Sequence, residues 1–215
     1  MAVDLARGVD WAVAVWAILK AGAAVVPAGS IAPNTEPVAK LGITVGEPSS
    51  ADWVSLDDPA IKTELSTRSA RPVTYADRTR ALRGNDPAFA AAGSTRTYDE
   101  LAAAEAKVRV DAELTFEART FGHTAADSFA ALVEPVAAGV AGASMVLVPA
   151  APDGLSAGLA EEWVTHLFGD RAGIESLDTA ELGDLQALIA GDVAPDNAGS
   201  VDVVLVLGDP RAPVA

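Results

Sequence analysis

The chain has 215 residues, of which 50% are hydrophobic and 21% are charged, so it can bury a sizeable core and is not typical of a disordered protein. Its formal net charge of −15 argues against nucleic acid and membrane surfaces as partners, because their phosphates repel an acidic protein. The absence of cysteine excludes disulfides, thiolate catalysis and cysteine-based metal sites, and two histidines leave little room for a histidine-based metal site.

The N-terminal part predicts a helix followed by a strand. Residues 9–21 are apolar enough for a buried helix, and Gly22 suits its C-cap. Residues 23–27 predict a short inner strand that ends at Pro27, and residues 29–37 predict a loop rich in Gly, Ser and Pro. The apolar stretch is too short to span a bilayer and no signal peptide is recognisable, so we expect a cytoplasmic protein.

The middle of the chain alternates between weak and strong patterns. Short strands are predicted at 41–45 and 53–56, whereas residues 57–85 are rich in charge and poor in apolar side chains. We therefore expect one domain, 1–215, whose possible lobes 1–84 and 85–215 are linked by that weakly patterned stretch. A helix follows at 98–110, with Thr97 and Glu100 spaced as a capping box.

The C-terminal part continues the alternation of helices and strands. The predicted strands are 115–121, 145–148 and 201–207, the last buried on both faces. The predicted helices are 127–141, bent by Pro135, then 155–162 and 179–190, while 164–168 suits either a helical continuation or a strand. The fold class predicted from this alternation is α/β, a largely parallel sheet flanked by helices.

One segment carries a family resemblance. Residues 7–27 contain an Arg, an apolar helix and then Leu-Lys-Ala-Gly, with Pro27 five residues beyond the glycine. This segment resembles a core motif of the AMP-binding, adenylate-forming superfamily, which includes acyl-CoA synthetases, nonribosomal-peptide adenylation domains and luciferases. Residues 121–149 and 162–168 resemble two further segments of that superfamily, in the same order. The resemblance implies part of the N-terminal domain of such an enzyme.

The sequence departs from the superfamily where the chemistry is expected. Its closest counterpart of the phosphate-binding loop is the stretch containing Gly93, Ser94 and Thr95, but Asp99 and Glu100 follow in place of Gly-Pro-Lys-Gly. Carboxylates beside such a loop oppose phosphate binding. The superfamily's magnesium-binding Glu, ribose-binding Asp and catalytic Lys have no recognisable counterparts. The pattern is similar to that of a truncated, degenerate relative, as in a small actinobacterial family distantly similar to AMP-binding enzymes.

Each candidate site residue has two interpretations. Gly93, Ser94 and Thr95 form either a residual phosphate loop or a capping loop for the following helix. His123 either lines an acyl pocket, as the resemblance implies, or is a partly exposed histidine at a strand end. His166 and Lys20 are interpreted as structural.

Ser128 and two acidic pairs also have two interpretations each. Ser128 is interpreted as a helix cap, not as a nucleophile beside Asp127. The acidic pairs 57–58 and 161–162 suit a divalent cation or, more simply, solvated faces.

The function predicted from these features is a non-catalytic, AMP-binding-enzyme-like protein without catalytic residues or a metal site. Its candidate ligand is a small acyl or nucleotide molecule, and we expect a homodimer or a protein partner. The alternative is a reduced ATP-dependent enzyme that forms an acyl-adenylate, uses ATP or AMP with magnesium, and needs a partner for the missing half. Composition and motifs do not name the ligand.

Overall fold

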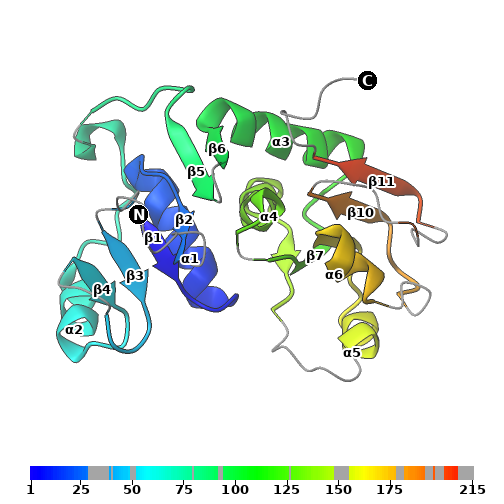
Figure 1. Cartoon of the computed structure of the whole chain (residues 1–215), viewed down its shortest axis with the longest axis horizontal. Helices are drawn as coiled ribbons and strands as arrows, with labels where there is room; N and C mark the ends of the chain where they lie inside the picture. The colour runs from blue at the N-terminus through cyan, green and yellow to red at the C-terminus, as the bar shows by residue number, and fades with distance from the viewer. Residues whose placement is uncertain are drawn as a thin grey trace. The chain divides into compact units, whose positions relative to one another are not determined.

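The computed structural model describes residues 1–28, 39, 41–48, 52–78, 80–91, 94–125, 127–147, 155–177, 182–191, 196 and 201–207. The chain divides into two compact units, unit 1 (Met1–Asp99) and unit 2 (Glu100–Ala215). Figure 1 shows the elements of both units, coloured from blue at the N-terminus to red at the C-terminus. The predicted loop at 29–37 and the predicted closing Pro149 lie outside the described residues.

Unit 1 is built around a parallel sheet with the strand order β2-β1-β3-β4. A hairpin of β5 and β6 adjoins β2 through a parallel bridge between Val25 and Phe89. The elements of unit 1 are β1 (Ala2–Asp4), α1 (Val9–Ala21), β2 (Val26–Pro27), β3 (Gly42–Thr44), β4 (Trp53–Ser55), α2 (Pro59–Thr67), the 3-10 turn η2 (Tyr75–Asp77), β5 (Pro87–Ala91) and β6 (Ser94–Thr97). Strands β1, β5 and β6 were not predicted from the sequence.

Helix α1 confirms the predicted helix and its glycine C-cap. Gly22 has φ 80°, in the left-handed region that glycine adopts without strain. The Gly22 N–H donates to the Leu19 carbonyl at 3.0 Å and the Ala23 N–H to the Ile18 carbonyl at 3.1 Å, which together form a Schellman motif.

Two distant side chains complete the end of α1. The Tyr98 hydroxyl lies 3.0 Å from the Leu19 carbonyl oxygen and 2.9 Å from that of Ala23, so its single proton is shared between two acceptors. Arg78 donates from Nε to the Lys20 carbonyl at 2.9 Å. Lys20 itself lies 5.8 Å from the centre of the Trp16 ring. The carbonyl groups at the end of α1 thus bind the side chains of Arg78 and Tyr98, which are distant in sequence.

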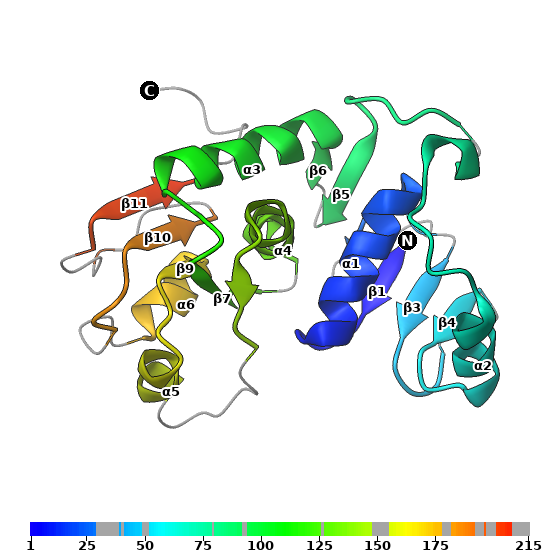
Figure 2. The ribbon, with the colours of Figure 1, turned by 180° about the vertical axis from the view of Figure 1, so that it is seen from behind.

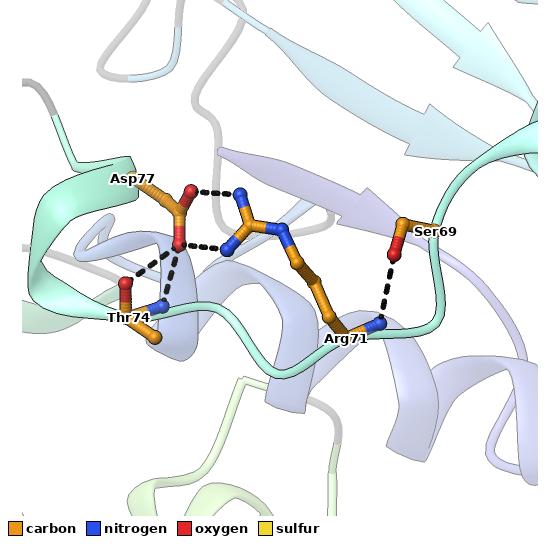
Figure 3. Close-up of polar contacts among 4 residues, drawn as sticks. All are labelled: Ser69, Arg71, Thr74 and Asp77. Atoms are coloured by element: carbon orange, nitrogen blue, oxygen red, sulfur yellow. Dashed lines mark hydrogen bonds and ion pairs between the residues drawn. The ribbon is translucent and has the colours of Figure 1, made fainter.

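The weakly patterned stretch 57–85 is mostly exposed in the described residues. It contains α2, which the sequence did not predict because the helix has no fully buried residue. A loop after α2 is held by the Arg71 guanidinium, which makes two hydrogen bonds to the Asp77 carboxylate (Figure 3). Asp77 also accepts from the N–H and hydroxyl of Thr74. The Arg71 guanidinium, and after it the two Thr74 donors, hold the pKa of the Asp77 carboxyl well below the ordinary value.

Unit 2 contains a five-stranded sheet in which every strand is parallel, in the order β11-β10-β9-β7-β8. The elements are α3 (Tyr98–Asp111), which begins in the last residues of unit 1, β7 (Arg119–His123), α4 (Phe129–Ala141), β8 (Ser144–Met145), α5 (Leu155–Glu161), β9 (His166–Gly169), α6 (Arg171–Glu175), β10 (Ala187–Ala190) and β11 (Val203–Val206). The α/β class with parallel sheets flanked by helices is therefore confirmed. Figure 2 shows the same elements from behind.

The predicted helix at 179–190 is wrong where the structure describes it, because residues 187–190 form strand β10. All four residues of β10 are buried between β9 and β11. A short apolar run fits a helix stripe and a strand covered on both faces equally well, so periodicity alone misled the prediction. Val204 in β11 is 38% exposed, so the 201–207 run is not buried on both faces, whereas β9 and β10 are.

Other predictions in unit 2 are confirmed with shifted bounds. Helix α4 begins after the Ser128 cap, whose hydroxyl accepts from the Ala130 N–H at 3.2 Å. Strand β7 begins at Arg119, four residues later than predicted, and the 164–168 stretch contains strand β9 and not a helical continuation. The short helix α6 was missed.

The two units share one arrangement of strands and helix. In unit 1 the chain runs β1-α1-β2 and then adds β3 beside β1 and β4 beside β3. In unit 2 it runs β7-α4-β8 and then adds β9 beside β7 and β10 beside β9. Helices α1 and α4 each have 13 residues and end at a left-handed glycine, Gly22 and Gly142. The order β2-β1-β3-β4 therefore corresponds to β8-β7-β9-β10.

Candidate functional site

Polar side chains gather at one edge of the unit 2 sheet. His123 is the last residue of β7, Asp170 follows β9 and Gly191 follows β10. Because the strands are parallel, their carboxyl ends meet at the same edge, where open α/β sheets bind ligands. The loops approach one another closely there: a Cβ on Gly191 would lie 3.2 Å from the Ser128 hydroxyl oxygen.

Asp170 joins the loops of this edge. Its Oδ1 accepts from the Gly173 N–H at 2.7 Å and so caps α6. Its Oδ2 accepts from the Ala125 N–H at 3.1 Å in the loop after β7. Both carboxylate oxygens therefore bind backbone amides, and Asp170 positions the loop that follows His123.

His123 contacts α6 and a neighbouring aromatic ring. Its Nε2 lies 3.3 Å from the Ser176 hydroxyl oxygen, and that hydroxyl donates to the Gly173 carbonyl at 2.7 Å. Since the serine proton is already used, the histidine Nε2 is the donor in the contact with Ser176. The Phe121 ring stacks against His123 with centroids 6.1 Å apart. This arrangement orients His123 but does not activate Ser176 as a nucleophile.

Gly173 allows this contact because of its size. A Cβ at position 173 would lie 2.2 Å from the His123 carbonyl oxygen, so any larger residue would force β7 and α6 apart. The glycine is thus required for the close approach of the helix to the strand end.

The predicted phosphate-loop residues lie in the other unit. Ser94 and Thr95 belong to β6, where they pair with Ala91 and Ala90 of the hairpin; Gly93 lies outside the described residues. Ser94 and Thr95 thus belong to unit 1, and His123 to unit 2. Ligand binding by these four residues stays a prediction.

His166 has the structural role expected from the sequence. It is fully buried, its Nε2 lies 2.7 Å from the Ala112 carbonyl oxygen, and its Nδ1 lies 2.8 Å from the Thr165 hydroxyl oxygen. Because a carbonyl only accepts, Nε2 donates to Ala112. Burial lowers the pKa of His166, so the neutral ring is favoured.

Sequence reasoning missed Asp170, Ser176 and Gly191. The available signal was the position of Gly-Asp directly after the apolar run 164–168, because a capping carboxylate after a buried strand is typical of a parallel sheet's carboxyl edge. Ser176 had no such signal, since its contact with His123 depends on the fold of α6.

Among the described residues, no group of three His, Asp or Glu side chains is placed to hold a metal ion. No helix in the described part of the chain is long and apolar enough to cross a membrane.

Comparison with solved structures defines the class of fold. The chain matches fragments of AMP-binding, adenylate-forming enzymes and corresponds to part of their N-terminal domain. No protein-family model matches the chain. No curated protein matches it either.

Three of these structures show the extent of the likeness. The N-terminal domain of FACL13 from Mycobacterium tuberculosis is 16% identical with a TM-score of 0.69, covering 95% of this chain and 61% of that one. The nonribosomal peptide synthetase FmoA3 is 19% identical with a TM-score of 0.68, covering 90% of this chain and 23% of that one. VinN in complex with L-aspartate is 16% identical with a TM-score of 0.65, covering 91% of this chain and 57% of that one. The chain thus spans between about a quarter and three fifths of these proteins' lengths.

Proposed function

We propose that the chain is a non-catalytic binding protein that holds a small acyl or nucleotide ligand at the carboxyl edge of the unit 2 sheet, around His123. The ligand class rests on the shared fold: VinN is described in complex with L-aspartate and FmoA3 in a form bound to an amino-acyl-AMP. The place of the ligand rests on the sheet, because parallel α/β sheets bind ligands at the carboxyl ends of their strands and His123 ends β7 at that edge.

One observation carries the non-catalytic part of the proposal. Three side chains at this edge that could serve as base or nucleophile hold the backbone instead: Asp170 binds two amides, Ser128 caps α4, and Ser176 donates to the Gly173 carbonyl. An acid–base catalyst needs a free proton acceptor within hydrogen-bond reach of the substrate. An edge built in this way supports binding better than proton transfer.

Calorimetric titration tests the ligand. AMP, ATP with magnesium, acetate and decanoate are titrated into the wild-type chain, the His123→Ala variant and the Phe116→Ala control, whose side chain is 73% exposed before β7 at the opposite end of that strand. We expect His123→Ala to weaken binding by about tenfold, as for one lost hydrogen bond to a charged group, and Phe116→Ala to leave it unchanged. Equal affinities in all three proteins would contradict the assignment of the site.

The alternative function is the reduced acyl-adenylating enzyme, for which ATP or AMP with magnesium is the cofactor. It predicts pyrophosphate exchange in the presence of ATP, magnesium and a suitable carboxylic acid. A robust exchange signal that is absent without the acid would overturn the non-catalytic proposal and establish the alternative.

We also propose that the protein is cytoplasmic and associates with a second copy or another protein. Exposed apolar side chains on α1 support this association, since Val9 and Val13 are 65% and 60% exposed one helical turn apart. Two copies that each carry −15 repel one another, so a homodimer is expected to strengthen as salt screens the charge. Light scattering between 20 mM and 500 mM NaCl tests this; a monomer at every salt concentration would refute the homodimer.

A further inference from the structure

A hollow lies beside the edge strand β4 of the unit 1 sheet. It has a volume of about 550 Å³ and is bordered by residues 46–48 after β3, by β4 itself, by the two aspartates that follow β4 and by Ile61 of α2. Figure 2 shows β3, β4 and α2 as neighbours. Its volume is in the range of small-molecule sites.

One wall of the hollow is a rigidly held aromatic ring. Trp53 lies so close against the backbone of β3 that a Cβ on Gly42 would stand 2.2 Å from the indole Cδ2. Gly42 is therefore required for the ring to lie flat on the neighbouring strand. Trp53 and Ile61 supply apolar surface to the hollow, and an indole face is the side chain that attracts organic cations most strongly.

The remaining lining is acidic. Glu47, Asp57 and Asp58 all border the hollow. Lys62 is a countercharge to Asp57, with its Nζ 3.6 Å from Asp57 Oδ1, but both of these side chains are more than half exposed, so the pair is weak. Asp58 caps α2 by accepting from the Ala60 N–H at 2.7 Å. The hollow therefore favours a cation.

We propose that this hollow binds a small organic cation, an ammonium or guanidinium group on an aliphatic body. The charged head lies among Glu47, Asp57 and Asp58, and the aliphatic body packs on Trp53 and Ile61. A metal ion fits less well, because no three acidic or histidine side chains in the described ranges are close enough together to ligate one. The apolar side chains of Trp53 and Ile61 also provide no ligand atoms for a metal ion. This site is separate from the His123 edge, which lies in unit 2.

The test uses small alkyl ligands with different head groups. Hexylamine, butylguanidine, hexanol and hexanoate are titrated into the protein while ¹⁵N–¹H NMR spectra are recorded, and magnesium chloride is titrated in a separate series. We expect saturable shifts of the Trp53 indole N–H and of amides in β4 with the two cations only. Hexanol binding as strongly as hexylamine, or magnesium displacing hexylamine at equimolar concentration, would overturn the proposal.

Matched variants test the named residues. Glu47→Gln removes one charge from the hollow, and Glu64→Gln removes one from an exposed residue of α2 that pairs with Arg68 instead. We expect Glu47→Gln to weaken hexylamine binding by about two- to fivefold, the usual range for an exposed charge pair, and Glu64→Gln to change it less than 1.5-fold, roughly the effect of a distant screened charge. Trp53→Leu should reduce the preference for hexylamine over hexanol. Equal effects of the two glutamine variants would refute the role of Glu47 and with it the proposed site.

Discussion

Replacing Gly22 with alanine tests the left-handed cap that closes the Leu-Lys-Ala-Gly segment. At φ 80° an alanine costs about 1–2 kcal/mol more than glycine, because its Cβ approaches the following carbonyl. The reduced entropy of the unfolded alanine chain offsets about 0.4–1 kcal/mol of that cost. The new Cβ would lie 3.6 Å from Leu82 Cδ1 and 3.9 Å from Arg78 Cδ, which are ordinary contacts and add no clash. We therefore expect Gly22→Ala to lower the free energy of unfolding by about 1 kcal/mol.

Urea denaturation followed by tryptophan fluorescence measures this loss, because Trp11, Trp16 and Trp53 all lie in unit 1. Gly158→Ala is the matched control: Gly158 lies in α5 with open space around its Cβ, so alanine there should stabilise unit 2 by up to about 1 kcal/mol. A Gly22→Ala variant as stable as the wild type would refute the left-handed cap.

Further predictions concern three other buried or capping groups. Burial lowers the pKa of His166, so its contribution to the free energy of unfolding is complete above the unfolded pKa near 6.5. This contribution is lost as the pH falls below that value, by at most about 1.4 kcal/mol per pH unit. In stability–pH curves measured by urea denaturation, His166→Gln should therefore flatten the region below pH 6.5. Burial also raises the pKa of Tyr98 to about 12, so its hydroxyl stays a hydrogen-bond donor. Tyr98→Phe should lower the free energy of unfolding by about 1 kcal/mol, measured by thermal denaturation. The control Tyr75→Phe changes a side chain that is 75% exposed and should have no measurable effect. Asp170→Ala should destabilise unit 2 by about 1–2 kcal/mol and speed amide exchange at Ala125. Asp170→Asn should recover only part of the loss, because its amide keeps one acceptor oxygen of the two that the carboxylate uses. Normal protection at Ala125 in the alanine variant would contradict the bridge between the two loops.

The sequence predicted the elements whose pattern is local and unambiguous. Helix α1 has an apolar stripe and a terminal glycine, and α4 has a serine cap, so both were found with nearly correct bounds. Strand β10 was mistaken for a helix because its pairing partners β9 and β11 are other segments of the chain, and the apolar run by itself carries no sign of that pairing. Strand β1 was missed because three residues carry no usable period, and only its pairing with β2 and β3 makes it a strand.

The candidate site was predictable only in part. The position of His123 at a strand end was anticipated, and the structure confirms that position at the end of β7. Its contacts were not predictable, because Ser176 and Asp170 are 53 and 47 residues away in the chain and meet it only through the parallel pairing of β7 and β9. The hollow beside Trp53 was missed for the same reason, since its aromatic wall depends on Gly42 in the adjacent strand.

The shared order β2-β1-β3-β4 and β8-β7-β9-β10 has a consequence for how the chain folds. Each sheet is assembled from consecutive segments, and β1 finds both of its partners within the first 44 residues. Short sequence separation lowers the entropy lost on closing each crossover and favours rapid folding. Each unit holds its own strands, helix cap and buried side chains, so unit 1 has every pairing partner of its sheets once residue 99 has left the ribosome. We therefore expect two successive folding events during synthesis, the first completed before the strands of unit 2 exist.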